Sequence, residues 1–221
     1  MDVRDALKAR RTVRAFLPRP VPRETLEAIL GDALQAPSWA NTQPWEIFVA
    51  AGEPLERIRA VWAERTETKV ASDTDIPFPG AWPAGCKERT KDLNIDRAKV
   101  TSTTPTDPAF HRDFLLANRR FFDAPCVVYL GMDQMLGSWS MFDLGALCQS
   151  ICLAAQDHGV DSAIAINMVL WPEVLREELR IPRELAVVIG LALGYVDPAG
   201  PEDAFRAARR PLGDVVRFIG I

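Results

Sequence analysis

Hydrophobic positions in the first third of the chain predict three helices and one strand. Val3, Ala6 and Leu7 recur at helical spacing and predict a short first helix. A second helix opens after Pro22, and its apolar stripe consists of Leu26, Ile29, Leu30, Ala33 and Leu34. The run WEIFVA (45–50) is typical of a strand, and a third helix is marked by Leu55, Ile58 and Trp62.

Apolar runs resume after residue 124 and predict a second set of helices and strands. Strands are expected at CVVYLGM, near SAIAINM and at LAVVIGLALGYV. Ser140 and Asp143 have the spacing of a capping box for a helix that runs to about Asp157 and stops at Gly159. A further helix opens at Pro172. Helices and strands are mixed without a regular βαβ order, so residues 1–221 are expected to form one α+β domain.

Residues 66–112 interrupt this pattern. The segment shows no helical or strand periodicity, is rich in proline and polar residues, and is too long for a simple connector. It is either a variable lid or a disordered insert. A lid is favoured because Phe78 and Trp82 are costly to leave in water.

Composition and charge exclude several classes of protein. A formal charge of −4 and a pI of about 5.3 argue against nucleic acid or an anionic membrane as partner. The beginning MDVRDALKARR has no apolar signal core, and no run is long enough to span a bilayer, so a cytoplasmic protein is expected. Cys148 and Cys152 lie one helical turn apart on an apolar helix, which favours core packing, and two histidines are too few for a typical zinc site. No metal is expected.

The loop APSWANTQPW (36–45) contains no charge, although loops usually face water. Ser38, Asn41 and Gln43 offer polar partners, whereas Pro37 and Trp39 offer apolar surface. Such a loop suits a flat, mostly apolar ligand with a few amide-like groups.

Two basic stretches near the ends of the chain suit a phosphate. In KARRTVRAF (8–16), an extended backbone would place Arg10, Thr12 and Arg14 on one side. Guanidinium groups bind phosphate oxygens bidentately, and threonine adds a donor. A solvated basic patch, or ion pairs with Asp5 and Glu24, explains this stretch equally well. The second stretch is the pair Arg209-Arg210 before Pro211.

Together, the two basic sites and the neutral aromatic loop match the needs of flavin mononucleotide (FMN). No GxGxxG or GxxxxGK[ST] phosphate loop is present. Five stretches, in this order, resemble the FMN-dependent nitroreductase family: RRTVRAF, APSWANTQPWEIFVA, DLGALCQSICLAAQDHGV, IPRELAVVIGLALGY and RRPLGDVVRFIG. They cover nearly the whole chain except residues 66–112.

The resemblance implies a mixed sheet flanked by helices in an intertwined homodimer, with FMN bound between the subunits. The cofactor-binding residues that it implies are Arg10, Arg11, Thr12, Arg14, Pro37, Ser38, Trp39, Asn41, Ile166, Asn167, Met168, Arg209 and Arg210. The substrate-binding residues are expected to be Trp39, Ala40 and Trp82. Many family members carry a small residue in place of Trp39, and some carry a lysine where this chain has Ala207.

The resemblance also implies the reaction. NADH or NADPH delivers a hydride to the flavin and leaves, and a small electron-poor acceptor such as a nitroaromatic then takes its place. No side-chain acid or base is required. Dehalogenation, enone reduction or flavin destruction on the same scaffold, and a non-catalytic flavin-binding protein, remain alternatives.

Overall fold

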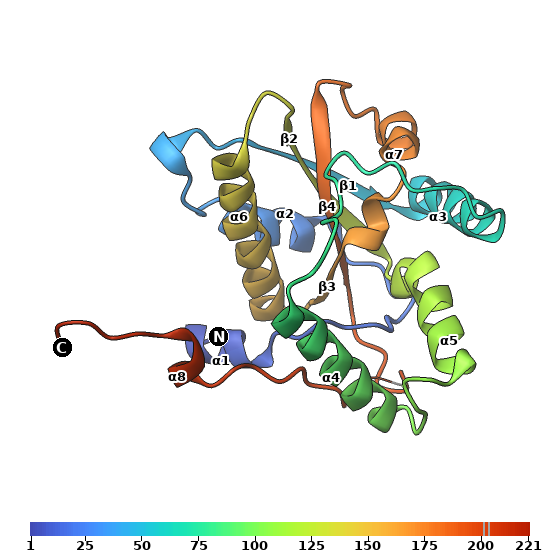
Figure 1. Ribbon diagram of the computed structural model, residues 1–221. Coiled ribbons are helices and arrows are strands. Elements are labelled where there is room, and N and C mark those ends of the chain that lie inside the picture. The colour runs from blue at the N-terminus through green and yellow to red at the C-terminus, as the bar shows by residue number, and fades with distance from the viewer. Residues whose placement is uncertain (201, 203) are drawn as a thin grey trace.

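A four-stranded antiparallel sheet forms the centre of the computed structural model, which describes residues 1–200, 202 and 204–221 (Figure 1). Its strands are β1 (Trp45–Ala51), β2 (Cys126–Asp133), β3 (Asp161–Ala165) and β4 (Leu185–Gly194), in the order β1-β2-β4-β3. All of β2 except Asp133 is buried. This burial on both faces explains why the central strands read as continuous apolar runs rather than alternating ones.

Helices cover both faces of the sheet (Figure 1). One face carries α2 (Arg23–Ala33) and α6 (Ser138–Asp157), and the other carries α3 (Gly52–Glu67), α5 (Pro108–Arg119) and α7 (Pro172–Leu179). Along β2, Val128 and Leu130 pack toward α2 and α6, whereas Val127 and Tyr129 pack toward the other layer. The predicted α+β class is therefore confirmed.

Aromatic rings anchor the layer formed by α3 and α7. Trp62 is fully buried and packs edge-on against Phe121 and Trp171, with ring centroids 5.4 and 5.1 Å apart. Its indole Nε1 donates to the carbonyl oxygen of Asn167 at 2.7 Å. This hydrogen bond fixes the backbone just after β3, where the sequence suggests a cofactor contact.

A parallel contact lies at the β3 edge of the antiparallel sheet. An isolated parallel bridge joins Thr12 to Ser162 of β3, and the amide of Val13 donates to the Ser162 carbonyl at 3.0 Å. The four named strands pair antiparallel. The segment after α1 (Val3–Ala9) therefore lies beside β3.

Residues 66–112 contain one whole helix, and the start of α5 at Pro108, that periodicity does not predict. Helix α4 (Ala84–Val100) lies in this segment, and of its side chains only those of Arg97 and Ala98 are buried. A helix that buries so few side chains leaves no apolar stripe in the sequence, which explains the missed prediction. The preceding stretch is tied to the body through Asp75, whose Oδ2 accepts from the Val187 amide and from Arg176, both at 2.7 Å.

Two boundaries near the sheet differ from the sequence prediction. Helix α6 begins at Ser138 after Gly137, so Ser140 and Asp143 lie inside the helix and do not form a capping box. Strand β3 ends at Ala165, and residues Ile166–Val169 form a 3-10 turn instead of continuing the strand. The predicted stop at Gly159 is confirmed, since this residue has a φ of 69°.

The chain ends in an extended tail that carries the short helix α8 (Leu212–Val215) and points away from the body (Figure 1). Large apolar side chains of the tail are exposed, among them Phe218, Ile219 and Ile221. The outer side of α1 likewise exposes Val3 and Leu7. Within the described part of the chain, no helix combines the length and apolar character needed to cross a membrane.

Candidate functional site

The loop over residues 36–45 has a strained backbone that a side-chain hydrogen bond spans. Ala40, Asn41 and Gln43 all have φ between 45° and 56°, in the left-handed region that non-glycine residues seldom adopt. The Ser38 hydroxyl oxygen accepts a hydrogen bond from the main-chain amide of Gln43 at 2.9 Å. Such strain costs on the order of 1–3 kcal/mol per residue and is concentrated at functional sites in proteins.

A buried carboxylate on α6 fixes the same loop. Both carboxylate oxygens of Asp143 accept from the Trp39 amide at 3.2 Å, although Asp143 is only 4% exposed. Trp39 itself remains 67% exposed. Sequence reasoning assigned Asp143 to a helix cap and missed this role. An aspartate inside an otherwise apolar helical run was the signal that could have revealed it.

An apolar hollow of about 450 Å³ lies beside this loop. Its lining consists of Pro37, Ser38, Trp39, Trp139, Phe142 and Asp143. Trp139 and Phe142 are also largely exposed and were not predicted from the sequence. The hollow offers flat aromatic surface and one hydroxyl, which suits a planar ligand with few polar groups.

The N-terminal segment predicted to bind phosphate is extended and only partly exposed. Arg10 ends α1, and its amide donates to the Ala6 carbonyl at 2.9 Å. Val13 is buried in the core, whereas Arg10, Arg11 and Thr12 keep part of their surface in solvent. These residues are therefore partly accessible next to the β3 edge.

Two buried cysteines on α6 lie close to the N-terminal segment. The pKa of the Cys148 thiol is raised mainly by its hydrogen bond with Cys152 and, to a smaller extent, by burial. The nearby positive charge of Arg10 opposes this shift. Cys148 therefore keeps its proton at neutral pH. Among the described residues, no group of three or more histidine, cysteine or acidic side chains could hold a metal ion.

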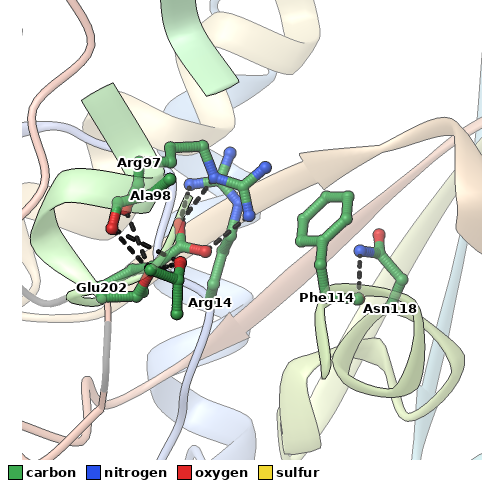
Figure 2. A network of polar contacts seen from close by, with 8 residues as sticks. Arg14, Arg97, Ala98, Phe114, Asn118 and Glu202 are labelled. Carbon is green, nitrogen blue, oxygen red and sulfur yellow. Dashed lines mark hydrogen bonds and ion pairs between the residues drawn. The ribbon is translucent and has the colours of Figure 1, made fainter. Parts of the chain in front are cut away.

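Arg14 does not face open solvent but joins a buried network with two other charged residues (Figure 2). Its Nη1 donates to Oε2 of Glu202 at 3.3 Å, and Arg97 of α4 donates to both oxygens of the same carboxylate, at 2.9 and 2.5 Å. The guanidinium carbon of Arg97 lies 3.9 Å from the centre of the Phe114 ring. Burial lowers the pKa of the Arg14 guanidinium, whereas the Glu202 charge raises it.

The geometry of the C-terminal segment explains how Glu202 reaches Arg14. The amide of Asp197 donates to the Ala15 carbonyl at 2.9 Å, and Phe16 forms an antiparallel bridge with Val196. At Gly200 an added Cβ would lie 2.6 Å from the Ala15 Cβ, so only glycine permits this approach. Residues 195–200 therefore run beside the N-terminal segment and deliver Glu202 to it.

The turn after β3 presents backbone rather than side chains. Asn167 uses its carbonyl to accept from Trp62, and the Met168 side chain is buried beneath Gly190. Ile166 is 53% exposed. A cofactor contact at Met168 can therefore involve only its main chain.

A second hollow, of about 460 Å³, joins α4 to the C-terminal segment. It brings together Trp82, Arg209 and Arg210, which are far apart in the sequence. The hollow beside Trp39 has a separate lining, so one chain does not gather the predicted substrate residues Trp39, Ala40 and Trp82 around a single cavity.

Comparisons with known proteins agree in assigning one family. The family model described as "Nitroreductase family" matches residues 7–195. A "Nitrobenzene nitroreductase" of Ectopseudomonas oleovorans and a "Chloronitrobenzene nitroreductase" of Comamonas testosteroni are each 32% identical over 217 residues, covering 97% of this chain and 96% of theirs.

Solved structures give the same result. The crystal structure of the FMN and NADPH-dependent nitroreductase NfnB from sphigopyxis sp. strain HMH superposes with a TM-score of 0.94 at 26% identity, covering all of both chains. NfnB from Mycobacterium smegmatis, solved in complex with NADPH, superposes with a TM-score of 0.91 at 26% identity, covering 98% of this chain and 97% of that one. With a family model and full-length relatives that all match, the chain belongs to the nitroreductase family.

Proposed function

We propose that this chain is an FMN-dependent NAD(P)H oxidoreductase that reduces small electron-poor acceptors such as nitroaromatics. The observation that carries the proposal is the full-length match to proteins named for this activity. The 32%-identical relatives are nitroreductases, and the superposed NfnB structures are of FMN- and NADPH-dependent enzymes.

The described residues fit FMN in the chemistry of their donors. The phosphate requires cations and hydrogen-bond donors, which Arg10, Arg11, Thr12, Arg209 and Arg210 can supply. The planar ring requires apolar surface with a few polar partners, which Pro37, Ser38, Trp39 and Asn41 can supply, together with the main chain of Ile166, Asn167 and Met168. The strained, uncharged loop supports this assignment, because strained backbone is concentrated at ligand-binding and active sites.

When bound, FMN supplies the two-electron chemistry. The residues of the chain orient the reactants and exclude water from them. Trp39 offers a flat apolar face to donor or acceptor, and Asp143 holds the Trp39 backbone in place. Arg14, which the resemblance assigns to the cofactor, pairs with the buried Glu202, so no role at the ring is assigned to it. No side-chain acid or base is assigned.

We also propose that the active form is an intertwined homodimer. Three apolar surfaces of one chain are exposed, and they support this proposal: the outer side of α1, residues Trp139 and Phe142 on α6, and the tail after Pro211. Because Trp39 and Arg209 line separate hollows in one chain, a second copy offers a simple way to bring both kinds of residue to one flavin. A truncation that lacks residues 211–221 should therefore dissociate more readily in sedimentation velocity. A full-length protein that is monomeric with complete flavin occupancy would refute the dimer.

Steady-state kinetics test the function. If donor and acceptor occupy the same flavin face in turn, varying NAD(P)H at several nitroaromatic concentrations should give parallel double-reciprocal lines. Truncating Trp39 to Ala should change acceptor preference more than FMN affinity, since it removes aromatic contact worth about 0.5–1.5 kcal/mol. Intersecting lines would refute the shared face. Absence of flavin reduction by NAD(P)H would refute the enzyme and favour a flavin-binding protein.

A further inference from the structure

The hollow between α4 and the C-terminal segment collects more positive charge than sequence reasoning foresaw. Arg209 and Arg210 line it from the C-terminal side, and Arg89 lines it from the first turns of α4. Trp82, Leu93, Ala207 and Ala208 supply apolar wall around these three guanidinium groups.

The three arginines have only weak or main-chain partners. Arg89 contacts the Cys86 sulfur at 3.2 Å. Arg209 donates to the carbonyl oxygens of Ala207 and Ala208, and Arg210 donates to that of Asp214. None of the ion pairs found among the described residues includes Arg89, Arg209 or Arg210, in contrast to Arg14 and Arg97, which share a carboxylate.

The carboxylates in the same lining leave an excess of positive charge. Asp92 and Asp96 also line the hollow, and Asp96 is paired with Lys99 at 2.8 Å. The three arginines thus share the hollow with two carboxylates. That of Asp96 is already paired with Lys99, which leaves that of Asp92. An anion with several oxygens would satisfy the arginines better than the main-chain carbonyls do.

Ala207 lies in this lining next to Ala208 and Arg209, and its methyl group brings no charge to the hollow. Arg89 reaches the same hollow from a distant part of the sequence. We propose that Arg89 is a phosphate-binding residue of the FMN site and supplies, from α4, a further cation beside Arg209. This inference rests on the proposed function, in which Arg209 binds the FMN phosphate.

The proposal gives α4 a role that its sequence pattern does not reveal. Helix α4 buries little of its own surface, so few apolar contacts hold it to the chain. An anion shared by Arg89 and Arg209 would link α4 to the C-terminal segment. The segment 66–112 would then become part of the cofactor site.

Equilibrium binding to the flavin-free protein tests the role of Arg89 without measuring turnover. Arg89→Ala should weaken FMN binding about ten- to hundredfold, the usual effect of losing a charged hydrogen-bond partner. Riboflavin, which has no phosphate, should bind the variant and the parent equally. Arg89→Lys should retain part of the FMN affinity because it keeps the charge.

Charge transplantation makes the test specific. In the double variant Arg89→Ala/Ala207→Lys, the new lysine should restore FMN affinity, at least in part. Lys91→Ala is the matched control, because Lys91 is exposed on the same helix but is absent from the lining of the hollow. It should leave FMN and riboflavin affinities unchanged.

Two results would overturn the inference. One is an Arg89→Ala variant that binds FMN as well as the parent does, and the other is an equal loss of FMN and riboflavin affinity, which would indicate a structural role. Arg209→Ala separates this failure from that of the proposed site. If Arg209→Ala selectively weakens FMN and Arg89→Ala does not, only the inference fails; if neither does, the phosphate lies elsewhere.

Discussion

Replacing Glu202 by Gln should destabilise the protein far more than loss of a surface charge. The Glu202, Arg97 and Arg14 side chains are 11%, 4% and 18% exposed, so water screens them little. Glu202→Gln keeps the size of the side chain but leaves two buried guanidinium charges without a counter-charge. Removing one partner of a buried pair costs about 3–5 kcal/mol.

The expected cost for this variant lies near the lower end of that range. Arg97 keeps its contact with the Phe114 ring, 3.9 Å away, and Gln still offers one oxygen to accept a hydrogen bond. We therefore expect a loss of about 3 kcal/mol in the free energy of unfolding. For a chain of this length, that corresponds to a Tm lower by about 6–12 °C.

Urea unfolding at fixed protein concentration, followed by circular dichroism, measures the effect. Glu27→Gln is the control, because Glu27 pairs with Arg23 on the exposed side of α2 and should cost less than about 0.5 kcal/mol. A double-mutant cycle of Glu202→Gln with Arg97→Met should give a coupling energy above about 1.5 kcal/mol. If Glu202→Gln costs no more than Glu27→Gln, the network does not contribute to stability as described.

The remaining predictions concern packing and burial. In Gly190→Ala the new Cβ would lie 2.6 Å from the Met168 Cβ, so the variant should lose about 1–3 kcal/mol in urea unfolding. Gly31→Ala on α2, with no atom within 4 Å, should gain about 0.5–1 kcal/mol, and equal effects would refute the steric reason. Burial raises the pKa of the Cys126 thiol to about 12, so at pH 8.5 iodoacetamide should modify the partly exposed Cys86 well before Cys126. Because the unfolded thiol ionises first, Cys126 should make stability fall by up to about 1.4 kcal/mol per pH unit between about pH 9 and 12, a slope that Cys126→Ala should reduce.

The sequence alone determined the elements whose side chains are strongly buried. The apolar stripe from Leu26 to Ala33 predicted α2, and the continuous apolar runs predicted β2 and β4, because burial on one or both faces leaves a direct trace in the residue pattern. The uncharged loop 36–45 and the order of the five motifs were also sufficient to identify the family. These signals are local or depend only on order along the chain.

Only the tertiary structure decided where β3 ends and what several charged side chains contact. Strand β3 stops at Ala165, and three residues later the Met168 side chain packs against Gly190, which is a neighbour in space and not in sequence. Helix α4 escaped prediction because it buries too few residues to produce a period.

The partners of these charged side chains lie far from them along the chain. Arg14 meets Glu202 across 188 positions, and Asp143 meets the Trp39 amide across 104. Arg89 shares a hollow with Arg209 only because the C-terminal segment passes α4. The periodicity of a sequence shows which positions of a helix or strand face the core. The partner of a charged side chain depends instead on which distant segments the folded sheet brings together.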